Sequence, residues 1–378
     1  MTALPASARL FLGHFLKDRL LHVLALAGTL LALFHPVTPE RAWQSVHLPT
    51  LLTLSGLLVL TKGIELSGAF DHLGRHILNR LTHERPLALF LTGAAALLST
   101  VLTNDIALFV MVPLTLSLRN LAGLPIARLV IFEALAVNAG SMLTPIGNPQ
   151  NILLWQLSHR SFLAFTAMMA PLALLLTALL LVLAAGSFPN RPIRIRLPET
   201  PADWNRPLFW ACAVLYVLFV AAVEWGEPAW GLAALLTAVA WIRARLLAEA
   251  DWSLIAVFLL MFVDIRLLTD AALLKPLLDP LVQAGALRDY LTTIAVSQVI
   301  SNVPATILLT PWLPAGPLLA FAVNAGGFGT AVGSLANLIA LRMAKDRSSW
   351  LQFHYFSMGF LGIAVALGWI LLHFSGPI

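Results

Sequence analysis

Apolar residues fall along the chain in long runs that short polar stretches separate. A membrane-crossing helix needs roughly 20 mostly apolar residues, and nine runs predict such helices. They lie at 20–34, 48–66, 126–157, 162–185, 207–223, 228–245, 251–268, 315–346 and 350–374. Helices at these positions would leave little of the chain for any soluble domain.

Two further apolar stretches, 86–118 and 286–312, carry polar residues near their middle. The interrupting residues are Thr103-Asn104-Asp105 in the first and Ser301-Asn302-Val303-Pro304 in the second. Each half, at about 10–16 residues, is too short for a comfortable crossing. Both stretches therefore predict re-entrant helical hairpins, whose irregular tips are tolerated at membrane depth only inside protein or beside a watery cavity.

Composition supports this pattern, since 59% of the 378 residues are apolar and 11% are charged. Soluble domains average roughly 45–50% and about 25%, so a soluble enzyme, a disordered chain and a disulfide scaffold are excluded. The lone Cys212 can form neither an intrachain disulfide nor a thiolate metal cage. We expect an all-α polytopic membrane protein whose partner is the lipid bilayer. The net charge of +5 suits cytoplasmic loops and predicts no nucleic-acid partner.

Basic residues indicate the orientation. With nine crossings, two hairpins, a cytoplasmic N-terminus and an external C-terminus, 17 of the 23 basic residues fall on the cytoplasmic side, as the positive-inside rule requires. This predicts a multi-pass protein of a bacterial inner membrane. The predicted parts are a cytoplasmic segment 1–19, a first repeat 20–185, a linker with a connecting helix 186–227, and a second repeat 228–374.

The two halves resemble each other in sequence. Residues 137–151 read VNAGSMLTPIGNPQN and residues 323–337 read VNAGGFGTAVGSLAN, with seven identities at a shift of 186. The hairpins align at a shift of 198, with Asn104 facing Asn302. Five predicted crossings separate equivalent helices, and because five is odd the second half is inverted. Inverted repeats with broken helices are typical of secondary transporters.

Glycine and proline interrupt the apolar helix at 126–157, namely Gly140, Pro145, Gly147 and Pro149. Such a break frees backbone carbonyls for a cation and backbone amides for an anion. Neutral polar side chains accompany both breaks: Asn138, Thr144, Asn148 and Asn151 in the first, and Asn324, Thr330, Ser334 and Asn337 in the second. Two aligned breaks favour a binding site over helices that are kinked only for packing through small residues.

Carboxylates at membrane depth are costly and usually functional. Asp105 is predicted to carry a coupling cation, although aspartate can also cap the half-helix that follows. Glu133 is either a second proton site or a buried, hydrogen-bonded carboxylate that fixes its helix. Asp264 and Arg266 predict a pair at the outer interface, rather than part of the pathway.

Histidines supply no evident metal site, since His72, His76 and His83 share one cytoplasmic stretch that predicts an amphipathic interfacial helix. The chain has no HExxH, GxSxG or P-loop motif, and it is expected not to be an enzyme and to hold no cofactor or metal.

Together the two hairpin tips and the run Leu143–Asn151 resemble the ion transporter superfamily, in particular short bacterial permeases of the arsenite-permease or NhaD type. The resemblance covers roughly residues 48–374. It implies a scaffold region and a transport region, with substrate and coupling ions between hairpin tips and helix breaks. Carried over by position, the first cluster is Thr103, Asn104, Asp105, Gly147 and Asn148, and the second is Ser301, Asn302, Thr330, Gly333 and Ser334.

We expect a proton- or sodium-coupled secondary transporter of a small inorganic anion or oxyacid, with arsenite-type export as one form. Asp105 disfavours a dicarboxylate, because dicarboxylate symporters of this superfamily have a neutral residue there. Sodium/proton antiport and carboxylate symport, with a carboxylate anion as partner, are the alternatives. A passive channel and an intramembrane enzyme are weaker, and the oligomeric state, a homodimer included, stays open.

Overall fold

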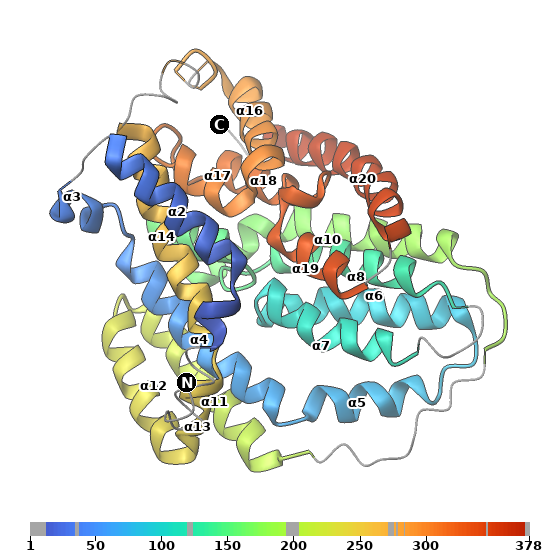
Figure 1. Ribbon diagram of the computed structural model, residues 1–378. Coiled ribbons are helices and arrows are strands. Elements are labelled where there is room, and N and C mark those ends of the chain that lie inside the picture. Colours follow the sequence, from blue (N-terminus) through green and yellow to red (C-terminus); the bar gives the residue numbers. More distant parts are fainter. Residues whose placement is uncertain are drawn as a thin grey trace. The chain divides into compact units, whose positions relative to one another are not determined.

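The computed structural model describes residues 13–34, 38–118, 124–193, 204–270, 276, 279–282, 284–344 and 347–374, and their regular structure is helical apart from one isolated bridge (Figure 1). The chain divides into two compact units. The first unit comprises Met1–Ser67, Arg206–Ala284 and Ile307–Trp312. The second unit comprises Gly68–Asn205, Gly285–Thr306 and Leu313–Ile378. Each predicted apolar segment coincides with a helix or with a pair of half-helices.

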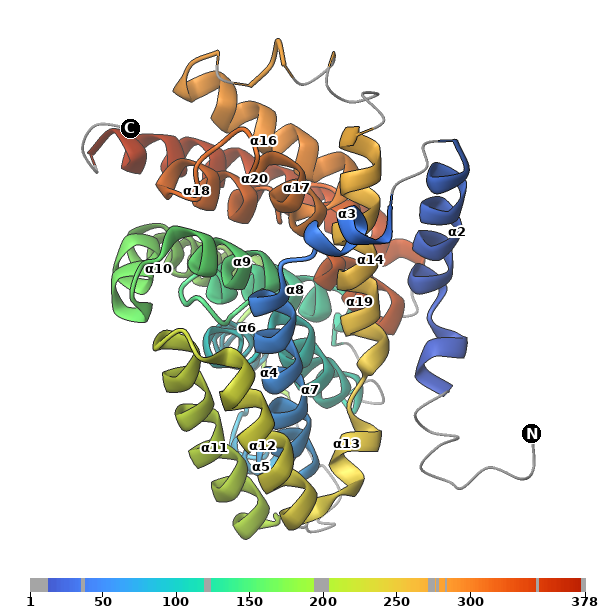
Figure 2. The same ribbon diagram turned by 90° about the vertical axis from the view of Figure 1, so that its left-hand side faces the viewer.

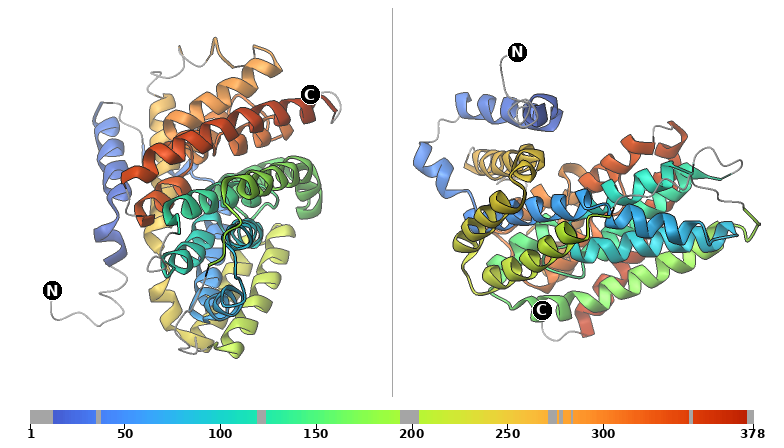
Figure 3. Two further views of the ribbon diagram at one scale, coloured as in Figure 1. Left: turned by 90° about the vertical axis from the view of Figure 1, so that its right-hand side faces the viewer. Right: turned by 90° about the horizontal axis from the view of Figure 1, so that it is seen from below.

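The first unit is built around one well-buried helix. Its elements are α2 (Arg19–Phe34), α3 (Pro39–Gln44), α4 (Leu48–Leu66), α11 (Arg206–Glu224), α12 (Pro228–Arg243), α13 (Arg245–Glu249) and α14 (Trp252–Asp270). Helix α4 packs against α11, α12, α13 and α14, and α2 lies along α14 (blue and gold in Figure 3). Small residues on α4 let the neighbouring helix α11 pack closely. A Cβ on Gly56 would overlap the ring of Phe219, and a Cβ on Gly63 would overlap the sulfur of Cys212.

The second unit holds both broken helices, the first predicted hairpin, and the second predicted hairpin as far as Thr306. From the first half it contains α5 (Ala69–Leu78), α6 (Glu84–Val101), α7 (Asn104–Leu116), α8 (Ile126–Ser141), α9 (Pro149–Ser158) and α10 (Phe162–Ser187). From the second half it contains α16 (Ala286–Ile300), the start of α17 (Asn302–Leu309), α18 (Pro317–Ala325), η1 (Ala331–Gly333), α19 (Leu335–Ala344) and α20 (Arg347–Phe374). Helix α18 packs against both α16 and α20 (Figure 2).

Five helices in the described part of the chain are long and apolar enough to cross a membrane. They are Leu48–Leu66, Phe162–Ser187, Arg206–Glu224, Trp252–Thr269 and Ser349–Phe374. Four shorter apolar helices, α2, α7, α12 and α19, accompany them. The count of nine crossings and the inversion of the second half stay predictions.

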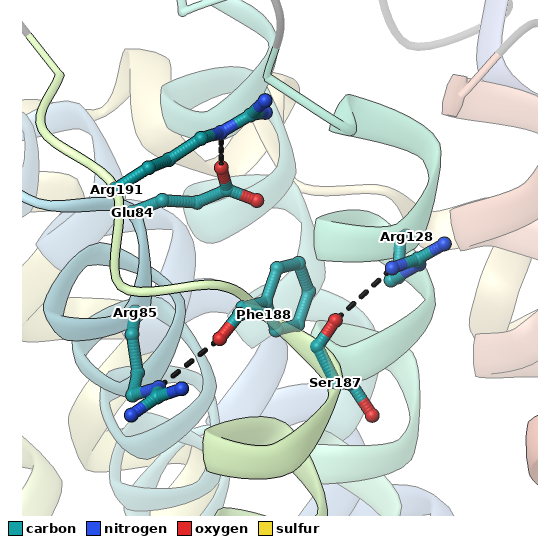
Figure 4. Close-up of polar contacts among 6 residues, drawn as sticks. All are labelled: Glu84, Arg85, Arg128, Ser187, Phe188 and Arg191. Carbon is teal, nitrogen blue, oxygen red and sulfur yellow. Dashed lines mark hydrogen bonds and ion pairs between the residues drawn. The ribbon is translucent and has the colours of Figure 1, made fainter.

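At the start of the predicted linker 186–206, the chain is bound by side chains of α6 and α8. Figure 4 shows the six residues involved, Glu84, Arg85, Arg128, Ser187, Phe188 and Arg191. Arg85 Nε donates to the Phe188 carbonyl at 3.1 Å, and Arg128 Nη1 donates to the Ser187 carbonyl at 3.0 Å. These cations occupy the carbonyl end of α10, where positive charge is favourable. Arg191 forms an ion pair with Glu84, whose carboxylate is buried.

Glycines let each hairpin approach its broken helix closely. A Cβ on Gly140, in the last turn of α8, would overlap the backbone carbonyl of Ala96 on α6. At the equivalent position of the second half, a Cβ on Gly326 would lie 2.5 Å from Cβ of Ser297 on α16. In both halves a glycine of the broken helix therefore lies against the helix that leads to the hairpin tip, and both glycines meet the equivalent serine, Ser99 or Ser297.

Substitution of Gly140 tests this contact. Gly140→Ala forces α6 away and should cost about 2 kcal/mol, the typical penalty of overpacking. The midpoint of thermal unfolding of the purified protein in detergent should fall accordingly. Gly362→Ala on α20 is the matched control, because its Cβ meets nothing within 4 Å. Equal midpoints for the two variants would contradict the close approach.

Candidate functional site

The first hairpin tip is tied directly to the first helix break. The backbone N–H of Asn104, where α7 begins, donates to the Gly147 carbonyl at 2.9 Å. The hydroxyl of Thr144 donates to the Thr100 carbonyl, at the end of α6, at 2.5 Å. All of the predicted site residues lie in the second unit, and this pair of bonds joins the tip and the break of the first cluster.

The second half repeats this bond. Thr330 is equivalent to Thr144 at the shift of 186, and Gln298 is equivalent to Thr100 at the shift of 198. The Thr330 hydroxyl donates to the Gln298 carbonyl at 3.0 Å. The similarity between the two sequence segments is therefore also a similarity in hydrogen bonding.

Four buried asparagines exchange hydrogen bonds between the two breaks. Asn138 Nδ2 donates to Asn337 Oδ1 at 2.7 Å, and Asn324 Nδ2 donates to Asn151 Oδ1 at 2.7 Å. Asn138 is equivalent to Asn324, and Asn151 to Asn337. A reciprocal exchange of this kind is what an approximate two-fold axis between equivalent segments produces. We call these four residues the asparagine network.

The remaining amide hydrogens of the network bind the carbonyls that the breaks release. Asn151 Nδ2 lies 3.0 Å from the Thr144 carbonyl, and Asn337 Nδ2 lies 2.9 Å from the Gly327 carbonyl. Asn138 and Asn324 each also donate to the carbonyl four residues earlier in their own helices. Because these amides are engaged within the protein, the network shapes both breaks, and its predicted contact with ligand stays a prediction.

The two breaks differ where the half-helices α9 and α19 begin. Asn148, the N-cap of α9, accepts from the Asn151 N–H at 2.9 Å and donates to Asn324 Oδ1 at 3.0 Å. Its equivalent is Ser334, which is 1% exposed and whose hydroxyl has no hydrogen-bond partner among the described residues. Serine is too short to repeat the bond that Asn148 makes across the two-fold axis.

Several buried polar groups at these half-helix starts lack partners within the described structure. The backbone N–H groups of Ile146, Asn148 and Ser334 have no acceptor there. Gln150 Oε1, in the first turn of α9, likewise accepts no hydrogen bond, and its side chain is 2% exposed. Unpaired buried backbone N–H groups are rare in native proteins. The start of a helix is also electropositive, so these groups form an arrangement suited to an oxygen-rich ligand.

The first hairpin tip places Asp105 in the first turn of α7, with 6% of its surface exposed. Thr103 holds the N-cap position but makes no side-chain cap hydrogen bond, and the capping role of Asp105 stays a prediction. The Asn104 side chain accepts from the Asp105 N–H at 3.0 Å. Asp105 is thus a buried carboxylate beside the residue that ties the tip to the break.

The second tip presents neutral groups only. Ser301 adopts a φ of 76°, and Val303 takes the place that Asp105 has in the first tip. A Cβ placed on Gly327 would lie 3.1 Å from Asn302 Nδ2 and 3.5 Å from Asn138 Oδ1. The second tip therefore reaches the asparagine network, and the two tips differ in charge.

Glu133 is fully buried on α8 and accepts a hydrogen bond from the Thr115 hydroxyl of α7. Its other carboxylate oxygen has no partner among the residues that the structure describes. The structure therefore provides the hydrogen bond of the structural alternative. A role as a second proton site stays a prediction.

The predicted Asp264–Arg266 pair is wrong. Asp264 is 5% exposed, and neither carboxylate oxygen has a hydrogen-bond partner in the described residues. The side chain lies against α2, where a Cβ on Gly28 would overlap its Oδ1. Arg266 is exposed, because two residues along a helix point to different sides. By contrast Lys62 and Glu65, three residues apart, form an ion pair at 2.8 Å.

Gln298 was missed by the sequence analysis. Its Nε2 donates to the Gly326 carbonyl at 2.8 Å, and its Oε1 accepts from the Thr330 N–H at 2.8 Å. It thereby satisfies two backbone groups that the second break releases. Its equivalent in the first half is Thr100, so the repeat gave no signal for it. The described residues contain no group of three or more histidine, cysteine or acidic side chains able to hold a metal ion.

Comparison with known protein sequences places the chain in a family. The model of the citrate transporter family, CitMHS, matches residues 15–315. The inner membrane protein YbiR of Escherichia coli K12 is 48% identical over 362 residues, which are 96% of this chain and 97% of its own length. The uncharacterized transporter MJ0456 of Methanocaldococcus jannaschii is 30% identical over 326 residues, 84% of this chain and 87% of its own. The silicon efflux transporter LSI3 of rice is 34% identical over 140 residues, 37% of this chain and 29% of its own.

Helical hairpins, broken helices and buried polar groups at the breaks define a membrane transporter. The chain belongs to the citrate transporter family, and it is a multi-pass protein of the bacterial inner membrane. The predicted ion-transporter-like permease is thereby confirmed at the level of the family. The arsenite-permease or NhaD type stays a prediction.

Removing one member of the asparagine network tests its structural role. Asn324→Ala removes the acceptor that Asn148 Nδ2 uses across the two breaks and the donor to Asn151 Oδ1, and it should cost about 2–4 kcal/mol. Ser334→Ala is the control, because its hydroxyl has no partner to lose in the described structure, and it should change stability by less than about 0.5 kcal/mol. Thermal unfolding in detergent measures both. A Ser334→Ala loss as large as that of Asn324→Ala would refute the network.

Proposed function

We propose that this protein is a cation-coupled secondary transporter of a small, uncharged or weakly acidic oxyacid, which it exports in exchange for protons. The observation that carries this proposal is the set of unpartnered buried N–H groups of Ile146, Asn148 and Ser334 at the starts of α9 and α19. Hydroxyl and amide oxygens, such as those of Ser334 and Gln150, lie on the same segments. Such groups bind a ligand that carries both oxygen acceptors and O–H donors.

The charge of the predicted site supports a neutral substrate. No lysine, arginine or histidine belongs to either cluster, and the first contains Asp105. A citrate ion would bring several negative charges to this carboxylate without a basic side chain to pair with them. A hydroxide such as silicic or arsenous acid brings none at neutral pH.

One relative points in the same direction. The rice protein that matches over 140 residues is named a silicon efflux transporter. We extend that substrate class to this chain as a proposal, together with outward transport. Because Cys212 is the single cysteine, a trivalent metalloid would be held through hydrogen bonds to its hydroxyl groups and not as a thiolate complex.

Alternating access follows from the architecture that we propose. With inverted repeats, the two tips and the two breaks would meet near the middle of the membrane, and Asp105 would carry the proton or sodium ion. Glu133, two helical turns from the first break, is the proposed second proton site. The asparagine network would keep the two breaks at a fixed spacing while the second unit moves.

Carboxylate symport is the second candidate, and the description of the family as citrate transporters favours it. The helix starts at α9 and α19 would then bind a carboxylate through their N–H groups. A sodium/proton antiporter without any organic or inorganic anion is the third candidate, and Asp105 would be its ion site.

Transport by purified protein in proteoliposomes distinguishes these candidates. A proton gradient should drive silicic or arsenous acid against its concentration gradient, measured by elemental analysis of the vesicles, and should leave radiolabelled citrate unmoved. Citrate accumulation without oxyacid accumulation would select the symporter. Sodium-driven proton flux that needs no added substrate would select the antiporter.

Asp105→Asn tests the coupling role in the same vesicles. The variant should retain exchange of substrate across the membrane and lose concentration driven by the pH gradient. The loss should be about tenfold or more, since coupling free energies are typically roughly 1–3 kcal/mol. Glu227→Gln, an exposed carboxylate between α11 and α12, is the control and should behave as the unaltered protein. An unchanged response of Asp105→Asn to the gradient would remove Asp105 from the coupling site.

A further inference from the structure

The second break is held from outside by a neighbouring helix. Two side chains of helix α20 form hydrogen bonds with its backbone. The Ser357 hydroxyl accepts from the Gly329 N–H at 2.8 Å, and His354 Nε2 accepts from the Ala331 N–H at 3.3 Å. Gly329 has a φ of 94°, a conformation that glycine adopts readily. The turn η1, which begins at Ala331, is thus attached to α20 through the Ala331 amide, and the residues just before it through the Gly329 amide.

The bond from Ala331 requires an uncharged histidine. His354 Nδ1 lies 2.7 Å from the Trp350 carbonyl, one turn earlier in α20. A carbonyl only accepts, so Nδ1 carries the proton and Nε2 presents a lone pair. A proton added to Nε2 would face the Ala331 N–H, and two donors repel each other. Binding of one proton therefore breaks the bond between η1 and His354, and the bond between Gly329 and Ser357 remains.

We propose that His354 is a proton-binding residue that controls the second break: in the neutral form it holds η1 against α20, and on protonation it releases η1. His354 is a positioning residue in this scheme, since it acts on the break through the backbone of Ala331. The inference stands apart from the identity of the substrate and from the role of Asp105, and it is tested without transport.

None of the described groups that touch the His354 ring carries a charge that could pair with a protonated imidazole. The described contacts of its ring are Ala331, the Trp350 ring at 5.2 Å and the Phe353 ring at 5.5 Å. The elements α10, α18 and η1 carry no charged side chain. The titratable groups on the remaining elements around α20, and on α20 itself, are Arg128, Glu133, Arg288, Asp289, Tyr290, Arg342, Arg347, Tyr355 and His373. In the described structure the His354 ring makes no hydrogen bond, ion pair or ring contact with any of them, so its own protonation decides the bond.

The first break has no equivalent of the bond between the Ala331 amide and His354. Pro145 takes the place of Ala331 in the sequence alignment of the two segments. Proline has no N–H, so no acceptor is needed there. The two breaks therefore respond differently to acid, and only the second is released.

A cysteine in η1 reports the release. Val332 is 39% exposed, and Val332→Cys in a Cys212→Ala background provides a single thiol for labelling with N-ethylmaleimide. At each pH the labelling rate of this reporter is divided by the labelling rate of the same reporter that also carries His354→Gln. This division removes the intrinsic pH dependence of the thiol. Glutamine keeps a neutral acceptor in place of Nε2.

Between about pH 7.5 and about pH 5.5, where histidine changes charge, this ratio should rise about three- to tenfold, the factor expected for one lost hydrogen bond. His373→Gln is the matched control. It lies on the same helix, is exposed and meets the Trp369 ring edge to face, and it should leave the rise intact. A flat ratio, or a rise that His373→Gln abolishes, overturns the proposal.

Amide hydrogen exchange in the unaltered protein is the second measurement, and it does not depend on any variant folding. After correction for the intrinsic effect of pH, peptides that cover residues 327–335 should exchange faster at about pH 5.5 than at about pH 7.5. Peptides that cover residues 141–149 should show no such change. Equal behaviour of the two breaks overturns the proposal.

Discussion

A polar backbone group inside an apolar bundle must find a partner, and the second unit is organised by that requirement. Each broken helix releases carbonyl and amide groups where no water is expected to reach them. The asparagine network binds the released carbonyls from within, with Asn151 and Asn337 each reaching the break of its own segment. The cross-links from Asn138 and Asn324 then make the geometry of one break depend on the other.

Much of this could be predicted from the sequence because it depends on local pattern. The apolar runs predicted every long helix, and Gly140, Pro145 and Pro149 marked where α8 ends and α9 begins. The shift of 186 between the two segments correctly paired the asparagines. Spacing along one chain does not tell which side chains meet across the two-fold axis, so the partners of Asn138 and Asn324 were visible only in the structure.

What the sequence did not predict correctly likewise depends on contacts between segments that are distant along the chain. Asp264 turned toward α2 because Gly28 leaves space there, a fact about a helix that is distant in sequence. Gln298 and His354 act on the second break from α16 and α20. These residues have no matching residue in the first half, so the repeat gave no signal for them. Groups that work against the symmetry of a duplicated fold have to be found from contacts.

The reciprocal asparagines also bear on how such a chain arose. A half-length chain with a single break would leave its own Asn138 amide without the acceptor that Asn337 provides. One hydrogen of that buried amide would then lack an acceptor unless a second copy bound to it across a two-fold axis. The network is therefore the interface expected of an ancestral pair of identical subunits, preserved after gene duplication and fusion. Once both copies lay on one chain, each position was free to diverge, and Asn148 and Ser334 now differ in this way, since Asn148 makes a bond across the axis and the Ser334 hydroxyl has no partner in the described structure.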